Sequence, residues 1–458
     1  MYSKIYTPDG ALYHFPYINI INDNKIIIGL SNIHHRYGHI SIMQYLSAIH
    51  YNFLFGLNGI LIPLAALSIY TIIFFLSYVY EKKNTSISSI FSILIIFYIT
   101  WKMNRYGEYG NDAPGHFIFF VIVLLYLKSI EENFRNKKDN FYLISLLSIF
   151  VFLNKTFLIL ALLFPLLFFD KKIFKEFFNI KFLFLFLFMF LWVIKNTLVT
   201  GCMIYPISVT CLQFSWTNFD YTANVFEVAL GSEAWAKDWS NQKVNILPFN
   251  EFLKNFYWLE FWLKNHFQKI LQILLPYISV VIIFFLIIKT MKKNKDITKN
   301  INFKNYIPLY IILIIGFFLW FLKAPLYRYG YSYIICLIAV SFSILVNINL
   351  KNLKLVKQKE MSIFIIVLCI FALTTKQIVR IYKNQGNHYI NSPWPKYYSQ
   401  STNNDLSKYE KKIINKLFYY YIPLNTYCFY EKSPCSSEKV DKNLKKMINK
   451  FGYQIFYF

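Results

Sequence analysis

The amino-acid sequence predicts an all-α, polytopic membrane protein, and three observations lead to this prediction. The 458 residues are 56% hydrophobic and only 16% charged, and the mean hydropathy is +0.39. Apolar runs long enough to span hydrocarbon recur along the whole chain. The excess of Lys and Arg lies in short clusters between these runs, which is typical of cytoplasmic loops and not of a nucleic-acid-binding surface.

Ten segments are apolar enough to be predicted as membrane spans. They cover residues 59–80, 87–103, 115–129, 141–154, 155–169, 182–199, 268–289, 306–322, 331–348 and 360–378. Residues 141–169 could form one long span or two short ones. We favour a break at Asn154-Lys155-Thr156, because a single span would turn the Lys-rich loop at 289–304 outward. We therefore expect a bundle of about ten transmembrane helices.

The distribution of Lys and Arg assigns the two sides of the membrane. Clustered cations in alternate loops define the cytoplasmic side, so both chain ends face the opposite compartment. This predicts a multi-pass protein of a bacterial inner (cytoplasmic) membrane with a periplasmic or otherwise extracytoplasmic active face. The predicted parts are an outer amphipathic first segment at 1–58, transmembrane helices at 59–199 with an outer loop at 104–114, a large outer loop at 200–267, transmembrane helices at 268–378, and an outer C-terminal segment at 379–458.

Four of the six cysteines lie in these outer segments. Cys428 and Cys435 enclose a short stretch that contains Pro434, which favours a turn, and we predict that they form a disulfide in an oxidising compartment. Cys202 and Cys211 could likewise close a small loop, or they could remain free thiols.

Common nucleotide and metal motifs are missing from the sequence. It contains no Walker loop, no GxGxxG, no HExxH and no CxxC pair, which argues against nucleotide hydrolysis, dinucleotide redox chemistry and common zinc sites. The histidines of the first 50 residues match no zinc spacing and are interpreted as a polar interfacial face. We therefore look for chemistry among the carboxylates and cations at the outer ends of the spans.

Two acids occupy such positions. Asp9 lies in a Pro-Asp-Gly turn that leads into an aromatic stretch, where composition alone also allows an ordinary turn residue. Asp112 ends a Gly- and Pro-containing outer loop at the head of a predicted span. The helix dipole would keep this carboxylate ionised as a base or metal ligand, and helix capping explains it equally well.

Cations that could hold a phosphate lie on the same predicted side. Arg36 belongs to the first outer segment, Arg105 shares a loop with Asp112, and Lys195 lies where a span enters the large outer loop. Arg328 sits in a short outer turn, where its guanidinium could bind phosphate at headgroup depth or simply extend toward the interface.

Taken in order, these segments resemble the bacterial GT-C-type membrane glycosyltransferases that use polyprenyl-phosphate sugars. The resemblance covers most of the chain and rests on Asp9 to His14, Gly29 to Arg36, Asp112-Ala113-Pro114, Lys195 to Pro206, Ala324 to Gly330, and Cys428 with Cys435. It implies a GT-C-like helix bundle in which Asp9 is the catalytic aspartate of the first outer loop and Asp112 is a second acid. Members of that family begin with a transmembrane helix before this loop, so we expect an apolar stretch of about 20 residues upstream.

The resemblance implies inverting transfer of a sugar from polyprenyl phosphate to a glycan, lipid or protein acceptor of the cell envelope. Asp9 would act as general base, and Asp112 would orient the acceptor or a divalent metal such as Mg²⁺ or Mn²⁺, whose involvement stays open. Arg328, helped by Arg105 or Lys195, would stabilise charge on the departing phosphate. The predicted substrate-binding residues are His14, Arg36, Arg105, Lys195 and Arg328.

Two other functions are weighed against this one. An O-antigen polymerase or ligase-like enzyme is expected to depend on arginines in a large outer loop, and residues 200–267 contain none. A non-enzymatic lipid or solute transporter is typically built from inverted repeats with polar residues at mid-membrane depth, and the sequence shows neither. An inactive relative of the glycosyltransferases is a further alternative.

Overall fold

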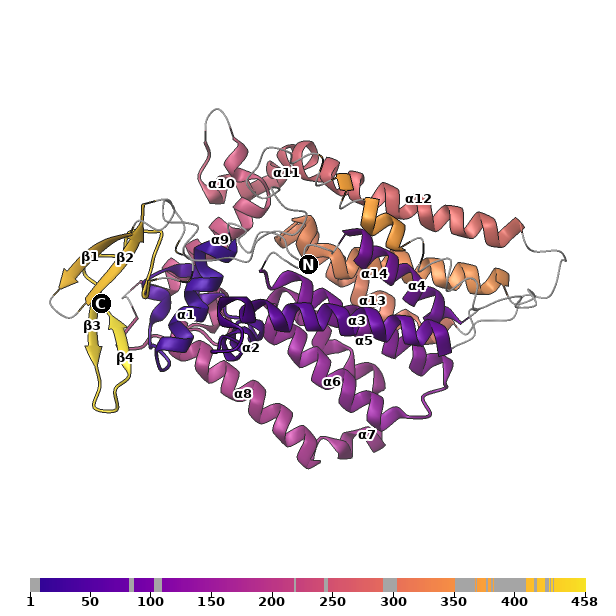
Figure 1. Ribbon diagram of the computed structural model, residues 1–458, viewed down its shortest axis with the longest axis horizontal. Coiled ribbons are helices and arrows are strands. Elements are labelled where there is room, and N and C mark those ends of the chain that lie inside the picture. Colours follow the sequence, from indigo (N-terminus) through magenta and orange to yellow (C-terminus); the bar gives the residue numbers. More distant parts are fainter. Residues whose placement is uncertain are drawn as a thin grey trace.

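Figure 1 shows the computed structural model, an elongated bundle of helices with short strands at one end. The structure describes residues 9–81, 86–102, 109–217, 220–242, 246–290, 303–350, 367, 369–375, 378–379, 382, 409–415, 418–424, 428, 430 and 432–458. Arg105 lies outside these residues.

The helices and strands of the described residues follow one another as expected for a largely helical chain. The helices are α1 (Phe15–Asp23), α2 (Ile42–Ile49), α3 (Ile62–Glu81), α4 (Ile87–Lys102), α5 (Asp112–Glu131), α6 (Lys137–Asn154), α7 (Lys171–Glu176), α8 (Ile180–Thr200), α9 (Tyr221–Ala236), α10 (Phe249–Leu253), α11 (Trp258–Trp262), α12 (Gln268–Thr290), α13 (Ile307–Lys323) and α14 (Tyr327–Leu350). The strands are β1 (Tyr409–Asn415), β2 (Phe418–Pro423), β3 (Lys445–Ile448) and β4 (Gln454–Tyr457).

Several helices mark the chain as a membrane-embedded protein. Five are long and apolar enough to cross a membrane: Gly59–Tyr80, Asp112–Glu131, Ile180–Thr200, Trp258–Ile283 and Tyr327–Ile348. Three apolar helices are shorter: Ile87–Trp101, Thr156–Phe168 and Ile307–Lys323. Helix α6 belongs to neither group, because Lys137, Lys138 and Asp139 open it, and the predicted span at 360–378 lies largely outside the described residues. The described helices therefore do not reach the predicted count of ten.

Helix α5 lies inside the bundle, and α8 lies at its edge (Figure 1). Every residue from Phe117 to Leu127 is buried, because a helix that is apolar all round must be enclosed by its neighbours, here α3, α4, α6 and α14. Helix α8 instead exposes large side chains such as Phe184, Leu187 and Leu191. These residues form a surface suited to lipid, so similar apolar compositions serve both the core and the membrane contact.

The apolar stretch after Lys137 is interrupted close to the predicted break. Helix α6 ends at Asn154, because Lys155 adopts an extended backbone with φ −149° and ψ 103°. A 3-10 segment at Thr156–Leu163 follows and packs back against α6. Lys155 therefore lies between the end of α6 and the start of the 3-10 segment, and not inside a helix.

Two antiparallel hairpins, β1 with β2 and β3 with β4, add a small β module to the helical fold. The module lies beside α1 (Figure 1). The Ile28 N–H donates to the carbonyl of Gln454 at 3.0 Å, and the Phe456 N–H donates to the carbonyl of Ile28 at 2.9 Å. Gly29 has a φ of +70°, and a Cβ there would overlap the Phe456 carbonyl oxygen. The C-terminal residues therefore pair directly with the first outer segment.

Disulfides close one loop in each of two predicted outer segments. One joins Cys202 with Cys211, and the other joins Cys428 with Cys435. The Tyr37 hydroxyl donates to the carbonyl of Cys435, so the second disulfide loop also contacts the first outer segment.

Replacing Gly316 by Val should destabilise the bundle, because a Cβ at this position in α13 would overlap the ring of Tyr333 in α14. Overpacking of this kind typically costs about 1–3 kcal/mol. The measurement is thermal unfolding of the purified protein in detergent. Gly110→Val is the control, because a Cβ at Gly110 meets no atom within 4 Å. Equal melting temperatures for the two variants would contradict close packing of α13 on α14.

Candidate functional site

Four charged side chains meet where several helices begin or end, and we call them the charged cluster: Asp9, Asp112, Lys155 and Arg328. Asp9 lies just before the helical turn Gly10–His14, and Asp112 is the first residue of α5. Lys155 follows α6, and Arg328 is the second residue of α14. An apolar bundle offers a charge no partner along its length, so charged side chains are expected at the helix ends, where other charged groups can pair with them.

Arg328 bridges the two carboxylates. Its Nη1 donates to Oδ2 of Asp9 at 2.9 Å, and its Nε lies 3.7 Å from Oδ2 of Asp112. The ammonium group of Lys155 donates to Oδ1 of Asp112. The cluster thus contains two anions and two cations, and it stays open to ligands, because the side chains of Arg328 and Asp9 are 40% and 31% exposed.

Neutral hydrogen bonds hold the backbone around the charged cluster. The Nε2 of His116 lies 2.7 Å from the carbonyl oxygen of Arg328, and its Nδ1 lies 2.7 Å from the hydroxyl of Ser332. A carbonyl can only accept, so Nε2 carries the proton and Nδ1 accepts from Ser332. Asn154 donates to the carbonyl of Asn111 at 2.6 Å and thereby fixes the residue before Asp112.

Aromatic rings enclose the charged cluster and bring in a further cation. The Lys155 ammonium lies 3.8 Å from the ring centroid of Tyr329, and the guanidinium of Arg36 lies 5.5 Å from that of Tyr13. Burial, followed by the charge of Asp9, raises the pKa of the Tyr13 phenol well above its ordinary value, so the ring stays neutral. The predicted Arg36 thus lies over the ring of Tyr13, whose phenol also feels the charge of the predicted Asp9.

His14, predicted as a substrate-binding residue, is buried and already hydrogen-bonded. Its Nδ1 lies 3.1 Å from the amide nitrogen of Gln44 and 3.4 Å from that of Asn111. Burial lowers the pKa of His14 to about 4, so the ring is neutral at neutral pH and its Nδ1 accepts from these amides. His14 therefore positions Asn111, next to Asp112, and does not present a charge to a ligand.

Lys195 contacts aromatic rings and not the residues of the charged cluster that the structure describes. Its buried ammonium is 3.2 Å from the ring centroid of Trp192 and 4.9 Å from that of Tyr45. The structure therefore unites Asp9, Asp112 and Arg328 and adds Lys155, while it places Lys195 against aromatic rings. The break in the apolar run at Lys155 was the sequence signal for the added cation.

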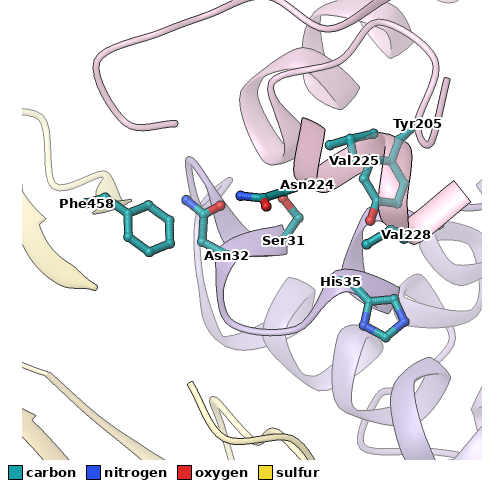
Figure 2. A pocket seen from close by; sticks show the side chains of 8 residues that line it. All are labelled: Ser31, Asn32, His35, Tyr205, Asn224, Val225, Val228 and Phe458. Atoms are coloured by element: carbon teal, nitrogen blue, oxygen red, sulfur yellow. The ribbon is translucent and has the colours of Figure 1, made fainter. Parts of the chain in front are cut away.

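The three predicted outer segments converge on one cavity of about 160 Å³ (Figure 2). It is lined by Ser31, Asn32 and His35 from the first segment, Tyr205, Asn224, Val225 and Val228 from the second, and Phe458 from the third. Figure 2 shows the carboxamides of Asn32 and Asn224 near one another, with the ring of Phe458 to one side. His35, which lines this outer cavity, precedes Arg36 in the sequence, and the guanidinium of Arg36 lies over the ring of Tyr13.

Residues 1–335 match a family model described as Domain of unknown function (DUF8201). The chain belongs to the DUF8201 family. Searches of the curated proteins and of the solved structures give no match. The matched range includes the whole charged cluster, while the β module of this DUF8201 protein lies beyond it.

His34, His35 and Glu438 join the β module to the first segment of the DUF8201 domain. Their three potential ligand atoms lie within 4.8 Å of one another, as a metal site would require. However, Nδ1 of His34 accepts from the backbone N–H of Arg36 at 3.1 Å, which leaves the proton of the neutral ring on Nε2, facing Ser437 at 3.2 Å. A metal would need that nitrogen deprotonated, so this arrangement fits a hydrogen-bonded contact better than a metal site.

Acidification should loosen the β module. Burial lowers the pKa of His34 to about 4 from 6.5, so docking is fully stabilised above pH 6.5 and weakens as pH falls toward 4, by on the order of 3 kcal/mol. The hydrogen bond from His35 lowers the pKa of Glu438 to about 2 from 4.5, which weakens docking further between pH 4.5 and 2. Hydrogen exchange of residues 409–458 at pH 7 and pH 4.5 measures the effect.

The matched variants are His34→Gln and His50→Gln. An amide at position 34 can still accept from Arg36 and donate to Ser437, but it does not titrate. After correction for the intrinsic pH dependence of amide exchange, the protection factors of this variant should therefore change little between pH 7 and 4.5. The ring of His50 bonds to the carbonyl of Leu46 in the adjoining helix α2, within the part of the chain that the structure describes. A pH response that is identical in both variants would contradict the role of His34.

Proposed function

We propose that this DUF8201 protein transfers a sugar from a polyprenyl-phosphate donor to a hydroxyl group of a cell-envelope glycan, lipid or protein. We further propose that it does so on the outer face of a bacterial inner membrane, with a GT-C-like bundle of about ten spans. The observation that carries the proposal is the charged cluster at the helix ends. A lipid-phosphate donor needs a base for the acceptor and cations for the leaving group at headgroup depth, and this cluster contains both kinds of group.

In the proposed reaction, Asp9 removes the proton from the acceptor hydroxyl as that oxygen attacks the anomeric carbon. The bond between this carbon and the phosphate oxygen breaks at the same time, and the phosphate leaves with the bonding electrons. Arg328 and Lys155 stabilise the negative charge of the leaving phosphate. Attack from the face opposite the phosphate inverts the anomeric configuration, and the acceptor proton ends on Asp9.

Substrate binding has to open the ion pair between Arg328 and Asp9. The base and the leaving phosphate act on opposite faces of the sugar ring, so Asp9 cannot stay in contact with the guanidinium that binds the phosphate. In the structure, Nη1 of Arg328 lies 2.9 Å from Oδ2 of Asp9. A phosphate offers the guanidinium a bidentate partner that replaces the carboxylate. Release of Asp9 would thus depend on donor binding, and the base would be freed only when a donor is present.

The outer cavity is proposed to receive the acceptor. Asn224 can donate to and accept from sugar hydroxyls, and the ring of Tyr205 can lie against an apolar sugar face. The amide nitrogen of Asn32 already donates to the carbonyls of Trp216 and Phe456, so Asn32 offers a sugar its carboxamide oxygen as an acceptor. Among the residues that the structure describes, no Lys or Arg lines the cavity, so it suits a neutral glycan better than a phosphate.

The charged cluster has little to offer a divalent metal. Each carboxylate already faces a cation, since Asp9 pairs with Arg328 and Asp112 pairs with Lys155. The formal charge of the four side chains is zero, while divalent cations such as Mg²⁺ favour sites with uncompensated carboxylates. The proposed reaction therefore uses no metal, and Asp112 serves to orient Arg328 and Lys155.

Asp9→Asn should lower transfer of labelled sugar from a polyprenyl phosphate by roughly 10²–10⁴-fold, because the amide cannot accept the acceptor proton. The assay uses membranes that contain the full chain. Asp441→Asn is the matched control, since Asp441 is an exposed turn residue of the β module. Equal transfer by the wild-type protein and by Asp9→Asn would remove Asp9 from its role as base.

Arg328→Gln should lower kcat by about 10²–10³-fold and raise KM for the donor, because the cation that meets the phosphate is lost. Arg328→Lys should recover only part of the rate, since an ammonium group cannot form the bidentate contact. Initial rates at varied donor concentration separate these effects. A variant that binds donor normally and loses rate only at low acceptor concentration would contradict the assignment. If the protein is instead an O-antigen polymerase or ligase, or a transporter, the wild-type protein should transfer no sugar from this donor.

A further inference from the structure

A second hollow, of about 350 Å³, lies at the opposite end of α6 from Lys155. It is lined by Arg135, Asn136, Lys137, Lys138, Asp139, Asp170, Lys172 and Ile173. Helix α6 has 18 residues, so at 1.5 Å per residue this basic hollow is about 27 Å from the charged cluster along the helix axis. The pattern of Lys and Arg assigns this end to the cytoplasm, so the basic hollow belongs to the other membrane surface.

The basic hollow carries more positive than negative charge. Four cations line it against two carboxylates. Lys137 is paired with Asp170 at 2.5 Å, and Lys138 is paired with Glu176 at 2.5 Å. Within the part of the chain that the structure describes, Arg135 and Lys172 have no ion-pair partner. The hollow therefore has two cations available for an anionic ligand, beside the carboxylate of Asp139, which leaves an excess of one positive charge.

Exposed aromatic residues flank the lining residues Asp170, Lys172 and Ile173 in the sequence. Phe169, Phe174 and Phe178 lie on α7 and its flanks and are 51%, 52% and 81% exposed. The next helix, α8, exposes a continuous apolar surface that suits lipid. Aromatic residues at this depth are typical of the membrane interface. A ligand with a phosphate in the hollow would therefore have acyl chains beside these rings.

We infer that the basic hollow binds the headgroup phosphate of an anionic phospholipid, with its acyl chains against the phenylalanines. The general tendency of cytoplasmic loops to be basic accounts for the presence of cations but not for their arrangement around one hollow. A soluble phosphate would use the same cations but would gain nothing from the exposed rings. The inference is independent of the proposed sugar transfer, because it concerns the other end of the bundle.

The test uses the full chain in a neutral detergent and follows its melting temperature and native mass spectrum during titration with phosphatidylglycerol. Phosphatidylcholine and soluble glycerol phosphate are the comparison ligands. We expect phosphatidylglycerol to bind and stabilise, and the other two to do so at least tenfold more weakly. Arg135→Gln with Lys172→Gln should weaken binding by about fivefold for each cation removed. Lys442→Gln with Lys450→Gln is the matched control, because both lysines are exposed in the β module, and it should bind like the wild-type protein.

Each outcome decides the inference. Equal loss of binding in both double variants would show a general charge effect and would overturn it. Equal binding of glycerol phosphate and phosphatidylglycerol would assign the hollow to a soluble anion and would also overturn it. If the Arg135 and Lys172 variant does not fold, Phe174→Ser with Phe178→Ser replaces it, and unchanged phosphatidylglycerol binding by that variant would contradict the acyl-chain contact.

Discussion

A hydrocarbon layer tolerates charge only at its edges, and the position of the charged groups in this DUF8201 protein follows from that constraint. The interior of α5 carries no charge from Phe117 to Leu127, so the neighbouring helices can enclose it with apolar side chains alone. Asp112, Lys155 and Arg328 lie where helices start or stop, and each finds its counter-ion on another helix. The ion pairs that stabilise these charges also bring carboxylates and cations together in the charged cluster.

The outer end of the molecule depends on contacts between segments that are far apart in the chain. Ile28 pairs with β4, Tyr37 bonds to the disulfide loop at Cys435, and His34 faces Glu438. These contacts hold the turn that carries Arg36, which in turn lies over Tyr13 beside the charged cluster. The β module therefore supports the geometry of the site although none of its residues lies in the charged cluster.

The charged cluster was partly predictable, because three of its residues stand at recognisable positions. Asp9 in a Pro-Asp-Gly turn, Asp112 at a helix start and Arg328 in an outer turn are each visible in the sequence, and the structure brings all three together. Lys155 stands at a break in the backbone after α6. Its ion pair with Asp112 depends on how α6 packs beside α5. Lys195 shows the opposite case, since its position on α8 turns it toward Trp192.

The sequence alone determined that the chain is helical and membrane-embedded, where its apolar segments lie, and which ionisable groups stand at their ends. These properties depend on local composition, because a run of apolar residues must leave water whatever its neighbours are. Only the tertiary structure decided which of these groups meet, that Arg328 bridges two carboxylates, and that the C-terminal residues pair with Ile28 as a β module. Such contacts join residues hundreds of positions apart, and they depend on how the helices pack, which no local pattern encodes.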